Sequence, residues 1–162
     1  MQRKMGVVLA AETEYDLLFV HRDADAAGHE ARTREIIEAS ANVEFNVNQI
    51  QIVPVRTTEA WILLNEAAIR RVAGKPRGRQ PLNLPRPSKV EHLADPKGAL
   101  DTALVAASGC RGRRLGKFRK RFGQHRQILL EQLPVGGALD RVPAWVRLRE
   151  AISALVAAQE AP

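Results

Sequence analysis

The chain contains the stretch Asp16-Leu17-Leu18-Phe19-Val20-His21-Arg22-Asp23-Ala24-Asp25. Its continuous apolar run, bounded by charged residues, is typical of a buried strand in a parallel sheet. A helical pattern over residues 29–41 and a second apolar run over residues 49–55 follow it. Strand, helix and strand in this order predict a βαβ unit with parallel strands. We therefore expect an α/β fold with a small parallel sheet flanked by helices.

The rest of the chain is predicted to be helical and basic. A helix begins near Thr58 and ends before Gly74, which is a natural C-terminal cap. Residues 74–88 hold 4 prolines and many charges, so we expect a long loop there. Three more helices are expected, over residues 96–107, 113–132 and 143–158.

Length and composition favour one intracellular domain. The chain has 162 residues, and we expect a single domain over 1–162. Residues 1–73 would form its α/β part with a metal site, and residues 74–162 a loop and a helical basic part. No apolar run approaches the roughly 20 residues that cross a bilayer, so no membrane partner is expected. The single cysteine, Cys110, excludes an internal disulfide and fits the cytoplasm.

Charge is distributed unevenly along the chain. Residues 1–60 carry 6 basic and 10 acidic side chains, whereas residues 61–126 carry 16 basic and 4 acidic ones. An acidic front and a basic middle suggest that one region holds cations while the other faces an anion. A solvated basic surface that keeps the protein soluble is the alternative.

Asp23 and Asp25 are the first candidate site residues. In extended backbone, residues two apart point the same way, and two nearby carboxylates repel unless a cation lies between them. Ligands of open α/β sheets bind beyond the carboxyl ends of the strands, where this pair lies. Mg²⁺ or Mn²⁺ is therefore the expected ion. In the alternative interpretation, one Asp caps the next helix and the other is solvated.

Two further residues follow the second strand. Glu59 opens the next helix and could supply a third carboxylate for the metal or act as general base. An ordinary carboxylate at a helix N-terminus is the alternative for Glu59. Arg56 could hold a phosphate near the metal, or it could pair with a neighbouring acid.

A basic stretch in the second half is the candidate nucleic-acid site. No acid occurs among residues 111–126, and like charges along a helix destabilise it unless an anion lies against them. Phosphate backbones are the usual anion, whereas base stacking is not expected, because the aromatics of this stretch, Phe118 and Phe122, are assigned to the apolar stripe of the helix. An acidic protein surface or plain solubility is the alternative. The candidate residues of this stretch are Arg113, Arg114, Lys117, Lys120 and Arg121, and Arg56 is expected to bind nucleic acid with them.

Four stretches together resemble a bacterial family of unknown function. They begin at Leu17-Leu18-Phe19-Val20-His21-Arg22-Asp23-Ala24-Asp25 and Val53-Pro54-Val55-Arg56-Thr57-Thr58-Glu59-Ala60-Trp61, and continue at residues 91–97 and 112–119. Members of the family look Toprim-like and are related to the nuclease domain of overcoming-lysogenization-defect proteins. The resemblance runs from about Asp16 to the C-terminus.

The resemblance implies a Toprim-like fold and magnesium-dependent phosphodiester chemistry. Asp23 and Asp25 match the family's Asp-x-Asp motif, and Glu59 matches the acid of its Glu-Ala-Trp motif, so these three are the implied metal-binding and catalytic residues. The family also has an upstream strand with a glutamate, which we expect to be missing here. A nuclease or phosphoryl-transfer protein acting on nucleic acid is therefore expected. An inactive module that binds nucleic acid or a partner ATPase in a defence system is one alternative, and an interaction domain without metal is another.

Overall fold

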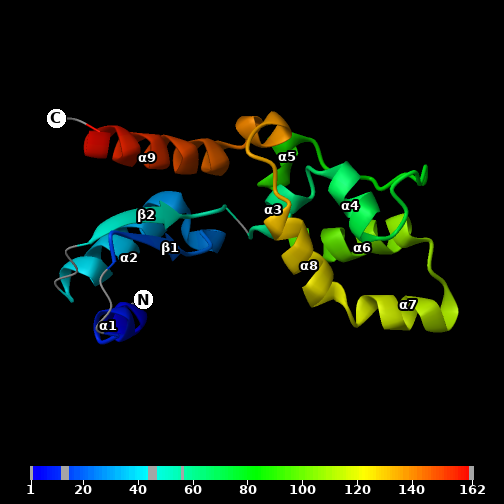
Figure 1. Ribbon diagram of the computed structural model, residues 1–162, viewed down its shortest axis with the longest axis horizontal. Helices are drawn as coiled ribbons and strands as arrows, with labels where there is room; N and C mark the ends of the chain where they lie inside the picture. Colours follow the sequence, from blue (N-terminus) through cyan, green and yellow to red (C-terminus); the bar gives the residue numbers. More distant parts are fainter. Residues whose placement is uncertain (1, 12–14, 44–46, 56, 161–162) are drawn as a thin grey trace. The chain divides into compact units, whose positions relative to one another are not determined.

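The computed structural model describes residues 2–11, 15–43, 47–55 and 57–160. The chain is mixed α/β and mostly helical, with one two-stranded parallel sheet in the described part (Figure 1). It divides into two compact units, each described by itself. Unit 1 comprises residues 1–55 and 143–162, and unit 2 comprises residues 56–142. That residues 1–162 form one domain stays a prediction. Within the described ranges, no helix is long and apolar enough to cross a membrane.

Unit 1 contains the expected βαβ arrangement. Its strands pair in parallel, with Leu17 opposite Asn48 and His21 opposite Ile52, which confirms the parallel pairing. Helix α9 contacts β2, and α1 contacts α2. The elements of unit 1 are α1 (Gln2–Leu9), β1 (Leu17–His21), the 3-10 helix η1 (Asp25–Ala27), α2 (His29–Ala41), β2 (Asn48–Ile52) and α9 (Pro143–Glu160).

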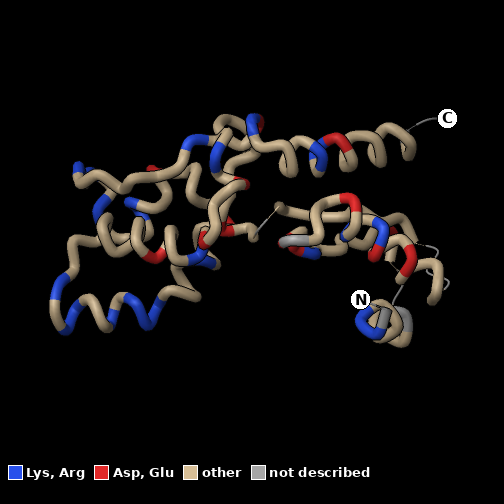
Figure 2. Tube along the Cα trace, turned by 180° about the vertical axis from the view of Figure 1, so that it is seen from behind, with Lys and Arg blue, Asp and Glu red and all other residues tan. Residues whose placement is uncertain are grey.

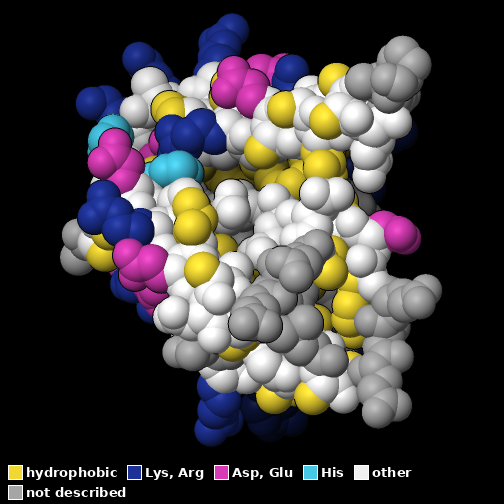
Figure 3. Space-filling model, turned by 90° about the vertical axis from the view of Figure 1, so that its left-hand side faces the viewer, with side chains coloured by type: hydrophobic (Ala, Val, Ile, Leu, Met, Phe, Trp, Pro, Cys, Tyr) yellow, Lys and Arg dark blue, Asp and Glu magenta, His cyan; other side chains and the backbone are white. Residues whose placement is uncertain are grey.

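The core of unit 1 lies on one face of β1. Val20 is buried, whereas Phe19, which points to the opposite face, is 50% exposed. The expectation of a strand buried on both faces is therefore wrong. Hydrophobic side chains are also visible at the surface in Figure 3, which shows the left-hand side of the view in Figure 1. The buried core residues are Met5, Val20, Ala24, Ile36, Ala39 and Val53.

Unit 2 is a group of short helices packed around α6. Helix α6 contacts α3, α4 and α7, and α8 contacts both α3 and α4. Fully buried side chains such as Ile69, Leu104 and Leu129 fill its interior. The helices are α3 (Glu59–Ile62), α4 (Glu66–Val72), α5 (Pro87–Val90), α6 (Pro96–Ser108), α7 (Gly112–Arg119), α8 (Phe122–Glu131) and the 3-10 helix η2 (Gly137–Arg141).

Two helices that we expect to be continuous are each divided in two. The first is divided between Ile62 and Glu66, where the Asn65 side-chain oxygen accepts a hydrogen bond from the Ala68 backbone N–H at 3.0 Å and so caps the start of α4. The second is divided at Lys120 and Arg121, which separate α7 from α8. Helix α6 agrees with the prediction, since Asp95 caps it by accepting from the Gly98 N–H at 2.8 Å.

Candidate functional site

The Asp23-Ala24-Asp25 loop is fixed directly after the end of β1. The parallel ladder continues beyond the strands, since the Arg22 N–H donates to the Ile52 carbonyl at 3.0 Å and the Ala24 N–H donates to the Pro54 carbonyl at 2.8 Å. Ala24 is fully buried in the core of unit 1. These contacts hold the loop at the carboxyl end of the strand pair, where ligands of α/β sheets usually bind.

The backbone of this loop is not extended. Ala24 has helical angles (φ −68°, ψ −38°), and Asp25 has a positive φ of 48°. The expectation of extended backbone is therefore wrong, and the argument that both carboxylates point the same way does not apply. The positive φ of Asp25 lies in the left-handed region, which Asp tolerates better than most residues.

The two aspartates have different surroundings. Asp23 is half-buried, and its Oδ1 lies 3.5 Å from Nε2 of His21. Together with Lys4 and Arg22, these two residues line a small hollow. Asp25 is exposed. Among its described residues, neither unit gathers three or more His, Cys, Asp or Glu side chains into a possible metal cluster.

Glu59 is a buried carboxylate of unit 2 with a cationic partner. Its side chain is 7% exposed, and its Oε1 lies 2.6 Å from Nε of Arg126 on α8. This ion pair connects the start of α3 to α8, which is a structural use of the acid. That Glu59 joins Asp23 and Asp25 at a metal stays a prediction. Arg56 lies outside the described residues.

The cations of α7 remain at the surface of unit 2. Helix α7 has no buried residue, and its Lys and Arg positions follow along the trace without an intervening acid (Figure 2). Arg119 forms an ion pair, because its NH2 atom lies 3.2 Å from Oδ2 of Asp101 on α6. Within the described part of the chain, the five predicted nucleic-acid residues have no ion pair: Arg113, Arg114, Lys117, Lys120 and Arg121.

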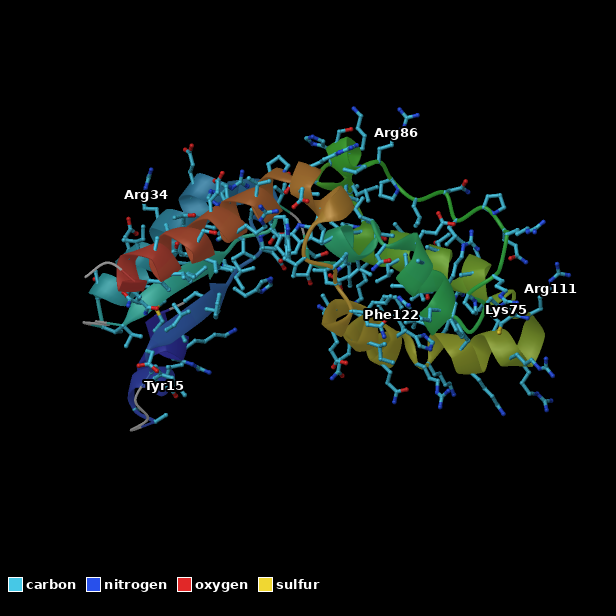
Figure 4. All side chains as sticks on the ribbon, turned by 45° about the horizontal axis from the view of Figure 1, so that its top comes forward. Tyr15, Arg34, Lys75, Arg86, Arg111 and Phe122 are labelled. Atoms are coloured by element: carbon cyan, nitrogen blue, oxygen red, sulfur yellow. The ribbon has the colours of Figure 1, made fainter. Side chains whose placement is uncertain are left out.

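A basic hollow, here called the loop hollow, is lined by the start of this helix and by a segment that lies far from it in the sequence. Lys75 and Arg79 of the proline-rich loop face Arg111 and Arg114 across it, and Lys75 and Arg111 are labelled at the same end of unit 2 in Figure 4. Sequence analysis missed Lys75 and Arg79, since the loop offers no local signal of where it folds. The loop hollow is lined by Lys75, Gly78, Arg79, Gln80, Ser108, Gly109, Cys110, Arg111 and Arg114.

Arg70 fixes the loop wall of this hollow. Its side chain is buried on α4, where its Nε and NH2 donate to Oε1 of Glu66 at 2.8 and 2.6 Å. NH2 also donates to the Gln80 carbonyl at 2.7 Å. A buried guanidinium that is paired and hydrogen-bonded holds its surroundings in one arrangement. The loop hollow therefore has a rigid wall.

A second hollow, here called the ring hollow, lies between α7 and α8. The rings of Phe118 and His125 pack with centroids 4.4 Å apart and a tilt of 35°. His125 is 9% exposed, and among the described residues its Nδ1 has no hydrogen-bond partner. Cys110 and Arg114 line both hollows, so the two adjoin. The ring hollow is lined by Cys110, Arg114, Lys117, Phe118, Lys120, Arg121 and His125.

The comparisons with known proteins give no relative. No protein-family model, no curated protein and no solved structure matches the chain. The resemblance to the Toprim-like family therefore stays a prediction, and the geometry of the two units carries the functional argument.

We predict that Glu59 stabilises unit 2. Glu59→Gln should lower the free energy of unfolding by about 1 kcal/mol, because the half-buried Arg126 loses its charged partner but remains open to water. Denaturant unfolding measures the change. Glu131→Gln is the matched control, since Glu131 is exposed and accepts only from Gln127. An equal loss in both variants would contradict the structural role.

We predict that stability falls in mild acid because of His125. Burial lowers the pKa of His125 below its usual 6.5, and Arg121 lowers it further. Near pH 6.5 the His125 ring therefore takes up a proton in the unfolded chain but not in the folded chain. The free energy of unfolding contributed by the uncharged ring is present above this pH and decreases as the pH falls below it. The unfolding midpoint should drop between about pH 7.5 and 5.5. His125→Phe, which cannot titrate, should show a smaller drop, and an unchanged drop would contradict this assignment.

Proposed function

We propose that this protein binds nucleic acid through unit 2, with phosphate groups as the recognised chemistry. The observation that carries this proposal is the separation of charge between the units. Unit 2 holds 18 Lys and Arg against 7 Asp and Glu, a net charge of +11, whereas unit 1 holds 7 against 11, a net of −4. A basic surface on one part of a protein is the usual electrostatic footprint of nucleic-acid binding.

The placement of the cations supports a polyanion more than plain solubility. A charge pattern that serves solubility mixes both signs over the surface. Here cations from two segments, Lys75–Arg79 and Arg111–Arg121, line two adjoining hollows, although they repel one another. A phosphate backbone carries one negative charge per nucleotide and can neutralise several of these cations together.

We predict that cations lining the ring hollow contribute to salt-dependent binding. Lys117→Gln combined with Arg121→Gln should weaken binding of any nucleic acid. It should also reduce the slope of log affinity against log salt by about one per phosphate contact removed. Fluorescence anisotropy at several salt concentrations measures both. Arg119→Gln is the matched control on the same helix, because Arg119 pairs with Asp101 and lines neither hollow. Unchanged affinity in the double variant would remove this role.

A second candidate function is a Toprim-like, magnesium-dependent nuclease. The hydrogen bond from the Ala24 N–H to the Pro54 carbonyl supports this candidate, because the bond holds Asp23 and Asp25 at the carboxyl ends of parallel strands. Mg²⁺ takes oxygen ligands and often binds one or two carboxylates while keeping several waters, so this pair fits the ion in donor type and number. A bound ion would supply an activated water and stabilise charge on phosphate. Glu59 fits less well, because Arg126 already neutralises it.

We predict that Mg²⁺ or Mn²⁺ raises the thermal unfolding midpoint if this candidate is correct. An ion that binds only the folded chain stabilises it by about 2.7 kcal/mol at a hundredfold excess over its Kd. Asp23→Asn with Asp25→Asn should abolish the rise and any nicking of supercoiled DNA. Asp16→Asn is the control, since Asp16 is exposed just before the other end of β1. No rise in the unaltered protein would rule out the metal site and leave the nucleic-acid proposal standing.

A further inference from the structure

The ring hollow differs from the loop hollow in having an aromatic wall. Phe118 is half-buried and packs against the buried ring of His125, so both rings are held in place. Burial and the charge of Arg121 lower the pKa of His125, which favours the uncharged imidazole at neutral pH. Its Nδ1 has no hydrogen-bond partner among the described residues, although buried polar atoms normally have one. The wall is therefore aromatic and uncharged, and a buried polar atom without a hydrogen-bond partner among the described residues lies behind it.

Cations surround this aromatic wall. Arg114, Lys117, Lys120 and Arg121 line the same hollow, and none of them forms an ion pair within the ranges that the structure describes. The hollow has a volume of about 690 Å³, within the range of about 300–1,000 Å³ found for ligand pockets. A ligand that fits it needs a flat apolar part and negative charges beside that part.

Resting on the proposed function, we infer that the ring hollow receives an unstacked nucleobase, and that the preferred ligand is single-stranded nucleic acid. The base would stack against Phe118, and its flanking phosphates would contact the surrounding cations. A base inside a duplex is already stacked on both faces and cannot enter the hollow without leaving its pair. Single strands bind proteins by this combination of aromatic stacking and a positively charged groove.

The adjoining loop hollow supports the same ligand. Arg114 and Cys110 line both hollows, so a strand whose base occupies the ring hollow can place its next phosphates beside Lys75, Arg79 and Arg111. The buried guanidinium of Arg70 holds the loop wall through Gln80. The two adjoining hollows thus offer aromatic rings at one end and, at the other, a lining whose charged side chains are all basic.

The test compares oligonucleotides that differ only in their bases. A fluorescent single-stranded oligonucleotide and an abasic strand of equal length and charge are titrated with the full chain at the same salt concentration. We expect the intact strand to bind about tenfold or more tightly than the abasic one, which is the usual size of one aromatic–base contact. Phe118→Leu should remove most of this preference, whereas Phe118→Tyr should retain it. Arg119→Gln should leave the preference unchanged.

The outcomes separate this inference from the proposed function. Equal binding of intact and abasic strands, both weakened in the variant with Lys117→Gln and Arg121→Gln, would overturn the stacking inference and keep the proposed function. Absence of binding to either strand and to duplex would overturn both. If Phe118→Leu does not fold, the NMR signal of the His125 ring decides. At saturation it should shift further with the intact strand than with the abasic one, and equal shifts with the two strands would overturn the inference.

Discussion

Burial of α6 sets the arrangement of unit 2. Leu100, Ala103, Leu104 and Ala107 are at most 1% exposed, and their helix contacts α3, α4 and α7. Lys and Arg cannot enter such a core without a counterion, because burying an unpaired charge is costly. Helix α7 therefore packs against α6 without burying any residue, and its cations stay in water. The basic surface is in this sense a consequence of how the apolar core is filled.

Local sequence patterns predicted the elements whose signals lie within them. The apolar runs of β1 and β2, and Asp95 followed by Pro96, located two strands and the start of α6. The breaks that divide these two predicted helices were missed for different reasons. The apolar residues before Asn65 favoured one continuous helix, so the capping role of Asn65 was not predicted, although Asn is a strong capping residue. Lys120 and Arg121 are good helix formers, but Gly116 and Gly123 on either side of them and the run of like charges weaken the helix at this point.

The candidate site could be predicted only in part. The position of Asp23 and Asp25 after a strand followed from the sequence. The positive φ of Asp25 did not, because the loop is held by hydrogen bonds to residues far along the chain, such as that from Ala24 to Pro54. The pairing of Glu59 with Arg126 joins residues far apart in the chain and has no local signal. Phe118 was assigned to an apolar stripe, yet the break after α7 leaves its ring lining a hollow beside cations.

The first turn of α7 brings together two unfavourable features that one kind of partner would relieve. It contains Arg113 and Arg114 and no acid, although the N-terminus of a helix carries partial positive charge. Arg111 at the cap position makes no side-chain capping bond, so the first N–H groups gain nothing from it. A phosphate lying there would accept hydrogen bonds from free N–H groups and neutralise the arginines at the same time. A neutral ligand would do neither, and for this reason we propose a polyanion as the partner of this surface.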